Sequence, residues 1–235
     1  MADTSSTERC DDCPMRTHGI LRGTPQKVLD RLACCMATYR FPPHHVIALE
    51  GNPCRQVGSI RSGRIKLSKC GENGRVQIVG AAGVGFVVGY EAFLGRPFQS
   101  TAETLTDVEI CMASHQDILQ QMADCPDLAK GLVAFLCHRI EELERKALHL
   151  GTLSTRQRLA AYLLSIGSND DGPNQYAADQ PPLTRQEIAE TLGMAKETLI
   201  RLLAKFEQQQ MIRLDGATVV IKDPARLRHV LSATH

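Results

Sequence analysis

The 235-residue sequence has no apolar run approaching eighteen residues, so it contains no candidate for a transmembrane helix. Its opening stretch, MADTSSTERCDDC, is polar and acidic and lacks the apolar core of a secretory signal peptide. We therefore expect a cytoplasmic protein without a membrane partner. A nucleophile motif, a phosphate-binding loop and a metalloenzyme motif are also missing, so we expect that the protein is not an enzyme.

An excess of charge is missing as well. The formal net charge is +1, from 27 Lys and Arg against 26 Asp and Glu. Any contact with a nucleic acid must therefore come from a local basic face of the molecule. A hydrophobic content of 43% is ordinary for a soluble globular protein, and the length allows one large domain or two modest ones.

A helix-turn-helix pattern lies between Pro182 and Asp223. Thr184 and Glu187 have the spacing of a capping box, in which the two side chains satisfy backbone amides at a helix start. Gly193 ends this helix, because glycine enters left-handed backbone conformations at little cost. A second helix is predicted from about Lys196 to Gln210. Its apolar residues recur with helical spacing: Leu199, Leu202, Leu203 and Phe206.

The segment MIRLDGATVVI follows as a predicted hairpin, with Asp215-Gly216 in a type I′ turn. A last helix is expected from Pro224 to about Ser232. Together these elements predict a winged helix, whose second helix enters the major groove of DNA. The alternative is two core helices of another all-α domain. The capping box, the glycine turn and the wing together favour the DNA-binding interpretation.

The first half of the chain has a different character. Thr24-Pro25 opens a predicted helix to about Arg40. Short β-rich runs separated by turns then extend from His44 to about His115: VIALEG, VGSIRSG, RIKLSKC, RVQIVGA, GFVVG, STAETL and VEICMAS. Many short strands at close spacing predict a small barrel or roll.

The longest helical run fits a heptad repeat. Its a positions are Val133, Ile140 and Ala147, and its d positions are Ala129, Leu136, Leu143 and Leu150. β-branched residues at a with leucine at d favour a parallel two-stranded coil, in which Arg139 would face Glu144 of a second copy. The alternative is a helix that packs only within its own chain. After Gly151, a further amphipathic helix is expected from Ser154 to Ile166.

These patterns predict an α+β fold in four parts. Residues 1–24 form a cysteine-containing segment, residues 25–126 a β-roll sensor domain, residues 127–150 a dimerisation helix, and residues 151–235 a winged helix-turn-helix domain.

Three segments carry a resemblance to one family. TRQEIAETLGMAKETLIRLL resembles the DNA-binding element of the Crp/Fnr family of bacterial transcription regulators, while SIRSGRIKLSKCGENGRVQIVG and LGRPFQSTAETLTDVEIC resemble its cyclic-nucleotide-binding-type β-roll. The chain resembles the Fnr-like, oxygen-sensing branch more than the cyclic-AMP-binding branch. The resemblance implies a homodimer that binds double-stranded DNA at a palindromic site with a TGA core and contacts RNA polymerase.

The second helix of the motif supplies most of the predicted DNA contacts. Side chains at its N-terminal end reach base edges, and the resemblance makes Glu197 and Arg201 base readers. Ile200 stands where the oxygen-sensing branch has serine, and Ala195 replaces the usual Ser or Thr cap. The predicted DNA-binding residues are Lys196, Glu197, Thr198, Ile200, Arg201 and Lys205, with Thr184 and Arg185 from the preceding helix.

The cyclic-AMP-binding residues of the family are not matched. The family's Gly-Glu pair for the ribose reads Gly89-Tyr90 here, and its Arg-Ser pair for the phosphate reads roughly Phe98-Gln99. A cyclic phosphate needs a cation or a nest of amides. We therefore expect a β-roll whose pocket is altered and which does not bind cyclic AMP.

Nine cysteines in a cytosolic chain suggest a metal, a redox role or buried thiols rather than disulfides. The oxygen-sensing branch holds an iron–sulfur cluster, which in most cases needs four thiolates. Here Cys10 and Cys13 form one Cys-x2-Cys pair, and Cys111 is the candidate third ligand, although it lies three residues beyond Val108 at the family's ligand position. Cys34, Cys35 or Cys54 could contribute instead.

Three interpretations of the signal stay open. The chain could sense oxygen, nitric oxide or redox state through a rearranged iron–sulfur cluster, carry no metal at all, or sense through haem or a reactive thiol. A cytosolic thiol enzyme and an interaction module without DNA binding are the rival classes of function.

Overall fold

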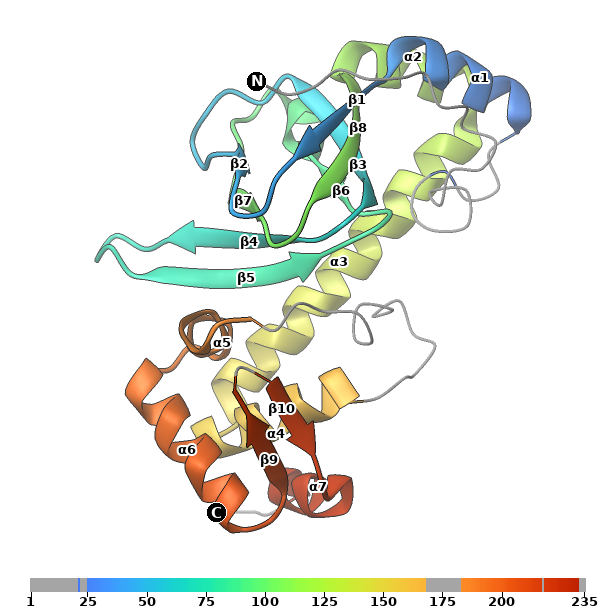
Figure 1. The fold of residues 1–235 in the computed structure, drawn as a ribbon. Helices are drawn as coiled ribbons and strands as arrows, with labels where there is room; N and C mark the ends of the chain where they lie inside the picture. Colours follow the sequence, from blue (N-terminus) through green and yellow to red (C-terminus); the bar gives the residue numbers. More distant parts are fainter. Residues whose placement is uncertain (1–20, 22–24, 168–182, 217, 233–235) are drawn as a thin grey trace. The chain divides into compact units, whose positions relative to one another are not determined.

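The computed structural model describes Leu21 and residues 25–167, 183–216 and 218–232 (Figure 1). These residues form two compact units. The first takes the residues up to Glu141 except Val76–Ile78, and the second takes Val76–Ile78 and the residues from Glu142 on. The four predicted domain ranges stay predictions. No helix among the described residues combines the length and apolar character needed to cross a membrane.

The first unit contains two four-stranded sheets, so the predicted roll is confirmed. One sheet has the order β1 (Ala37–Phe41), β8 (Val108–Ser114), β3 (Gln56–Ser62) and β6 (Val87–Val88). The other has the order β2 (Val46–Ala48), β7 (Thr101–Thr104), β4 (Ile65–Cys70) and β5 (Val76–Ala82). The pairs β1–β8, β3–β8 and β4–β7 are antiparallel.

Two apolar clusters hold this unit together. One draws on both sheets and contains the fully buried Ile60, Ile65 and Ile110. The other packs helices against strands β3 and β8, with Leu29, Ile118 and Leu128 buried in it. Strand β8 contributes to both clusters, with Val108 and Ile110 in the first and Ala113 in the second, because successive residues of a strand face opposite sides.

The predicted helix from Pro25 to Arg40 is too long. Helix α1 spans Gln26–Cys35, and Ala37–Phe41 form strand β1, which pairs with β8 in the register Ala37↔Met112 to Phe41↔Val108. This segment contains residues that favour strands: Thr38, Tyr39 and Phe41. It forms a strand instead of continuing the helix because it pairs with the edge of β8. The sequence interpretation does not predict two further helical segments, each of which follows a strand: the 3₁₀ helix η3 (Tyr90–Leu94) and α2 (His115–Asp124).

Helix α3 spans Pro126–Thr152, as the heptad run predicts. Its predicted a and d positions are largely uncovered, with Val133 59% exposed, Ile140 55% and Leu143 41%. Leu128, on another face, is buried. Arg139 is half-buried within its own unit, where the guanidinium lies 5.7 Å from the centroid of the Phe86 ring.

The second unit is a winged helix, as predicted. It consists of α4 (Thr155–Gly167), α5 (Arg185–Leu192), α6 (Lys196–Gln208), β9 (Ile212–Asp215), β10 (Thr218–Ile221) and α7 (Pro224–Ser232). Its core is formed by side chains that are at most 1% exposed: Leu159, Leu163, Leu199, Phe206 and Leu227. The hairpin turn is one residue later than predicted, because Asp215 already pairs with Thr218.

Candidate nucleic-acid interface

The helix-turn-helix motif is held by local hydrogen bonds at both ends of α5. Thr184 Oγ1 accepts from the Glu187 amide at 3.2 Å, and Glu187 Oε2 accepts from the Thr184 amide at 2.9 Å, which completes the predicted capping box. Gly193 has φ +60°, and the Met194 amide donates to the Ala189 carbonyl at 3.0 Å. This Schellman-type ending fixes the direction in which the chain enters α6.

Two arginines of α4, Arg156 and Arg158, bind residues in and next to the helix-turn-helix motif. Arg158 Nη1 donates to the Leu150 carbonyl at 3.1 Å, and its Nη2 donates to the Gly193 carbonyl at 3.4 Å. Arg156 lies 5.8 Å from the centroid of the Phe206 ring and donates from Nη2 to Gln209 Oε1 at 3.3 Å. A cation is favourable beside carbonyls at the C-terminal end of a helix. The sequence interpretation does not identify either arginine, since their partners are a distant ring, an amide and backbone atoms.

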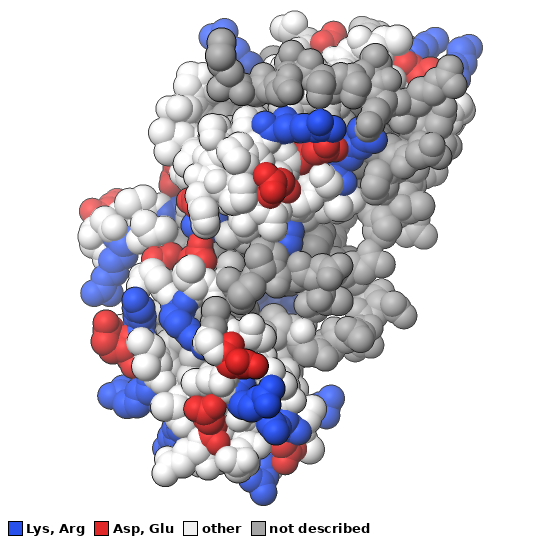
Figure 2. Space-filling view, in the orientation of Figure 1, with Lys and Arg blue, Asp and Glu red and all other residues white. Residues whose placement is uncertain are grey.

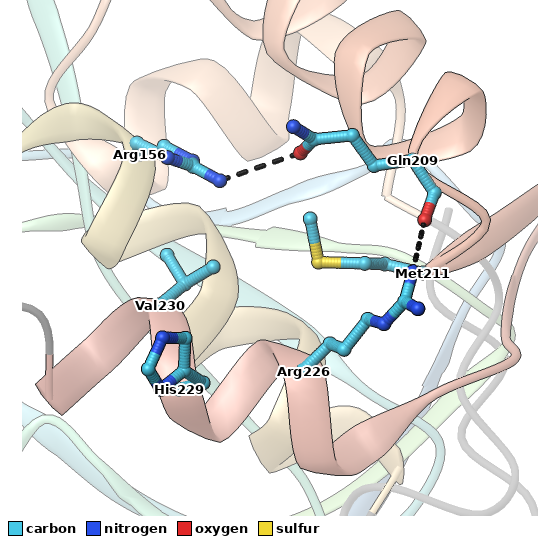
Figure 3. Close-up of a pocket in the computed structure, with 6 residues that line it drawn as sticks. All are labelled: Arg156, Gln209, Met211, Arg226, His229 and Val230. Atoms are coloured by element: carbon cyan, nitrogen blue, oxygen red, sulfur yellow. Dashed lines mark hydrogen bonds between the residues drawn. The ribbon is translucent and has the colours of Figure 1, made fainter.

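One of these two arginines, Arg156, also lines a small cavity of about 340 Å³ between α4, the end of α6 and α7 (Figure 3). Its lining residues are Arg156, Gln209, Met211, Arg226, His229 and Val230. Arg226 Nη1 donates to the Gln209 carbonyl at 3.1 Å, opposite the bond from Arg156 (Figure 3). Because both guanidinium groups are engaged with Gln209, we interpret the cavity as a packing joint that fixes the end of α6.

Helix α6 buries one side and exposes the other. Leu199, Leu203 and Phe206 are at most 2% exposed, as the helical spacing predicts. The exposed residues form the outer face of α6: Lys196, Glu197, Ile200, Arg201, Ala204, Lys205 and Gln208. Five of the six predicted DNA-contacting residues of this helix therefore lie together, while Thr198 is half-buried on the flank.

The charged side chains of this face are unengaged within the described part of the chain. Lys196, Glu197 and Arg201 make no hydrogen bond or ion pair there, and Glu197 does not pair with Arg201 although the two are four residues apart. Figure 2 shows Lys and Arg side chains on the surface of the second unit with Asp and Glu side chains among them. The visible surface of this unit is therefore mixed in charge, and on α6 the basic Lys196, Arg201 and Lys205 stand beside the acidic Glu197.

The two candidates from α5 are partly engaged. The Thr184 hydroxyl belongs to the capping box. Arg185 Nη2 donates to the Gly216 carbonyl of the wing loop at 3.3 Å, while its Nη1 is buried without a hydrogen-bond partner among the described residues. Arg185 therefore joins the start of α5 to the wing. The Leu214 amide of the wing donates to Glu207 Oε1 at 2.7 Å, which joins the wing to α6.

The β-roll holds an aromatic cluster near the residues that differ from the cyclic-AMP branch. The Phe135 ring of α3 contacts Phe86 edge-on at a centroid distance of 5.3 Å and lies 6.2 Å from Tyr90. Burial raises the pKa of Tyr90, and the neighbouring Glu91 adds to this, whereas Arg139 acts in the opposite direction. Glu91 is a buried carboxylate that the sequence interpretation overlooks, and its Oε1 accepts from the Gln99 amide at 3.2 Å.

Of the cysteine candidates in the described chain, Cys35, Cys54 and Cys111 lie in or against one apolar cluster of the first unit. Cys10 and Cys13 lie outside the described residues. Cys111 is half-buried with Sγ 3.5 Å from Thr38 Oγ1, and Cys54 is buried with its thiol donating to the Gly89 carbonyl at 3.3 Å. The pKa of Cys54 is raised to about 11, mainly by burial of the thiol and secondly by the negative charge of Glu91.

The described residues contain no group of three or more His, Cys, Asp or Glu side chains placed to hold a metal ion. These residues by themselves therefore do not fit an iron–sulfur cluster.

Comparisons with known proteins match both units. Residues 38–125 match the cyclic nucleotide-binding domain family, and residues 157–230 match the Crp-like helix-turn-helix domain family. The chain is 28% identical over 214 residues to the CRP-like cAMP-activated global transcriptional regulator of Mycobacterium tuberculosis, covering 89% of this chain and 94% of that protein. It is 25% identical over 229 residues to the transcriptional activator protein FnrL of Cereibacter sphaeroides, covering 93% and 90%.

A similar fold is present in the solved structure of FixK2 from Bradyrhizobium japonicum. The TM-score is 0.72 and the identity 22%, with 85% of this chain and 99% of that chain covered.

Proposed function

The chain belongs to the Crp/Fnr family of transcription regulators, and from this premise we propose that it binds, as a homodimer, to a palindromic DNA site with a TGA core in each half. Regulation of transcription through a DNA-binding helix-turn-helix is the common activity of its relatives, and none of those compared above is an enzyme by name. RNA polymerase is the proposed protein partner. The observation that supports DNA recognition is the exposed, unengaged outer face of α6.

The roles within this face follow from the chemistry of the side chains. Arg201 forms two hydrogen bonds to O6 and N7 of a guanine, and Glu197 accepts from N4 of a cytosine. Lys205, two turns beyond Glu197, contacts a phosphate, and Lys196 contributes at the N-terminal end of the helix. These roles are supported by three features that fix the orientation of α6 within the domain: the capping box, the Gly193 turn and the hydrogen bonds of Arg158.

A second copy of the chain is the proposed partner for the exposed stripe of α3. The stripe has the phase of a parallel two-stranded coil, with Val133 and Ile140 at a and Leu143 at d, and all three are substantially exposed in the single chain. Two copies present two outer faces of α6 to successive half-sites, about one helical turn of DNA apart. The full proposed interface is Val133, Leu136, Arg139, Ile140, Leu143, Glu144, Ala147 and Leu150.

DNA recognition is tested by titrating three proteins in gel shifts: wild type, Arg201→Ala and Lys205→Ala. Each is measured against a palindromic TGA-containing duplex and a scrambled duplex at two salt concentrations. Arg201→Ala should lose about 1–3 kcal/mol on the TGA duplex and little on the scrambled one. Lys205→Ala should weaken both duplexes alike and reduce the salt slope by about one unit. If Arg201→Ala weakens both duplexes in the same proportion, Arg201 does not read a base.

The proposed signal is oxygen, nitric oxide or redox state rather than cyclic AMP. The Cys10–Cys13 pair supports this assignment, and Tyr90 stands where the resemblance implies glutamate in the cyclic-AMP-binding branch. The alternatives are a regulator without a metal cofactor, or one that senses through haem or a reactive thiol. An ultraviolet–visible spectrum of anaerobically purified protein, with iron and sulfide assays, distinguishes a cluster from haem and from neither.

A further inference from the structure

Ile200 is an apolar side chain in the middle of the polar outer face of α6. It is 49% exposed, and it is the one large hydrophobic residue exposed among the described residues that follow α3. The other large apolar side chains of this helix, such as Leu199 and Leu203, point into the core. Ile200 is therefore not part of the buried core of the winged helix.

Helix formation does not account for Ile200 either. Isoleucine is β-branched and forms helices less readily than Ala, Lys, Glu or Gln, which occupy other positions of this face. Its helical neighbours on the outside are Lys196 one turn before it, Glu197 three residues before it and Ala204 one turn after it, and all are exposed.

The floor of the major groove presents one apolar group, the 5-methyl of thymine. Lys, Glu and Arg side chains read the polar edges of the bases, whereas a branched alkyl group has no polar atom and can contact only the methyl. We propose that Ile200 selects a thymine of the half-site by packing against its 5-methyl group, beside the base pairs read by Glu197 and Arg201. This inference rests on the proposed DNA-binding function and adds a base preference to it.

The test replaces each thymine of the bound duplex, one at a time, with deoxyuridine. Uracil pairs like thymine and lacks only the methyl. Wild-type protein should lose about fourfold in affinity at one half-site position, the amount expected for one methyl group returned to water. Ile200→Ala should bind the thymine duplex about as weakly as wild type binds the deoxyuridine duplex, and should be insensitive to the replacement. Ile200→Val, the matched control, should keep the sensitivity.

Because Ile200 is exposed, these variants leave the core of the domain intact. Equal deoxyuridine sensitivity in wild type and Ile200→Ala, or sensitivity at no position, would overturn the inference while leaving DNA recognition standing. Failure of wild type to distinguish the TGA duplex from the scrambled one would overturn the proposed function as well. The two failures are therefore distinguishable in one set of titrations.

Discussion

The start of α6, the proposed recognition helix, lacks the side-chain cap that α5 has, and one substitution tests the consequence. Ala195 occupies the N-cap with φ −71° and ψ 146°, and it supplies no side-chain acceptor. Serine adopts the same backbone conformation and places a hydroxyl where it accepts from the amide two or three residues on. Since Ala195 is exposed, Ala195→Ser should stabilise the first turn by about 1 kcal/mol without disturbing any packing.

Amide hydrogen exchange on the full-length chain measures this gain locally. A stabilisation of about 1 kcal/mol should slow exchange of the Glu197 and Thr198 amides by about fivefold if they exchange by fraying of the helix end. Ala204→Ser, on the same face but in the middle of α6, is the matched control and should give no protection. Thr184→Ala should have the opposite effect on the first turn of α5. Equal exchange rates in Ala195→Ser and wild type would refute the capping argument.

Three further predictions concern α3 and the cysteines of the first unit. Leu143→Glu, at a d position, should convert dimers to monomers in analytical ultracentrifugation, while Leu148→Glu, more exposed to solvent but outside the proposed seam, should leave dimers; monomers or dimers in both cases would contradict the seam. Iodoacetamide at pH 8 should modify the exposed Cys34 and spare Cys54 until the chain unfolds. Because the folded pKa of Cys54 is about 11 against an ordinary 9.0, its stabilising contribution is complete below pH 9 and is lost as pH rises toward 11. Cys54→Ala should therefore show a shallower loss of stability than wild type over that interval, and parallel curves would argue against the raised pKa.

Short-range sequence patterns were sufficient to predict most of the helices and strands. The Thr184–Glu187 box and the Gly193 turn depend on residues within five positions of one another, so the sequence alone locates them. The end of α1 could not be located in this way, because Ala37–Phe41 become a strand through pairing with β8, about seventy residues away in the chain. The hairpin register was off by one for a similar reason: the Asp-Gly signal marks a turn, while the ladder between β9 and β10 decides which residues pair.

In the candidate site too, features set by local spacing could be predicted from the sequence, whereas contacts between distant residues could not. Helical spacing alone puts Lys196, Glu197 and Arg201 on the outer face of α6. Heptad position alone gave no sign that Arg139 packs over Phe86 in its own chain, because that contact depends on how α3 lies against the roll. The hydrogen bonds of Arg158 to the Leu150 and Gly193 carbonyls could not be predicted from the sequence either, since a backbone carbonyl can accept from any arginine that reaches it.

The uncovered stripe of α3 also relates the activity of this regulator to its abundance. If only paired chains occupy a palindrome, then well below the dissociation constant of the pair the amount of active protein grows with the square of the chain concentration. A change of about twofold in synthesis would then alter the active pool about fourfold with no change in the signal. Val133, Ile140 and Leu143 would in this way set an expression threshold for the regulator, in addition to joining its two copies.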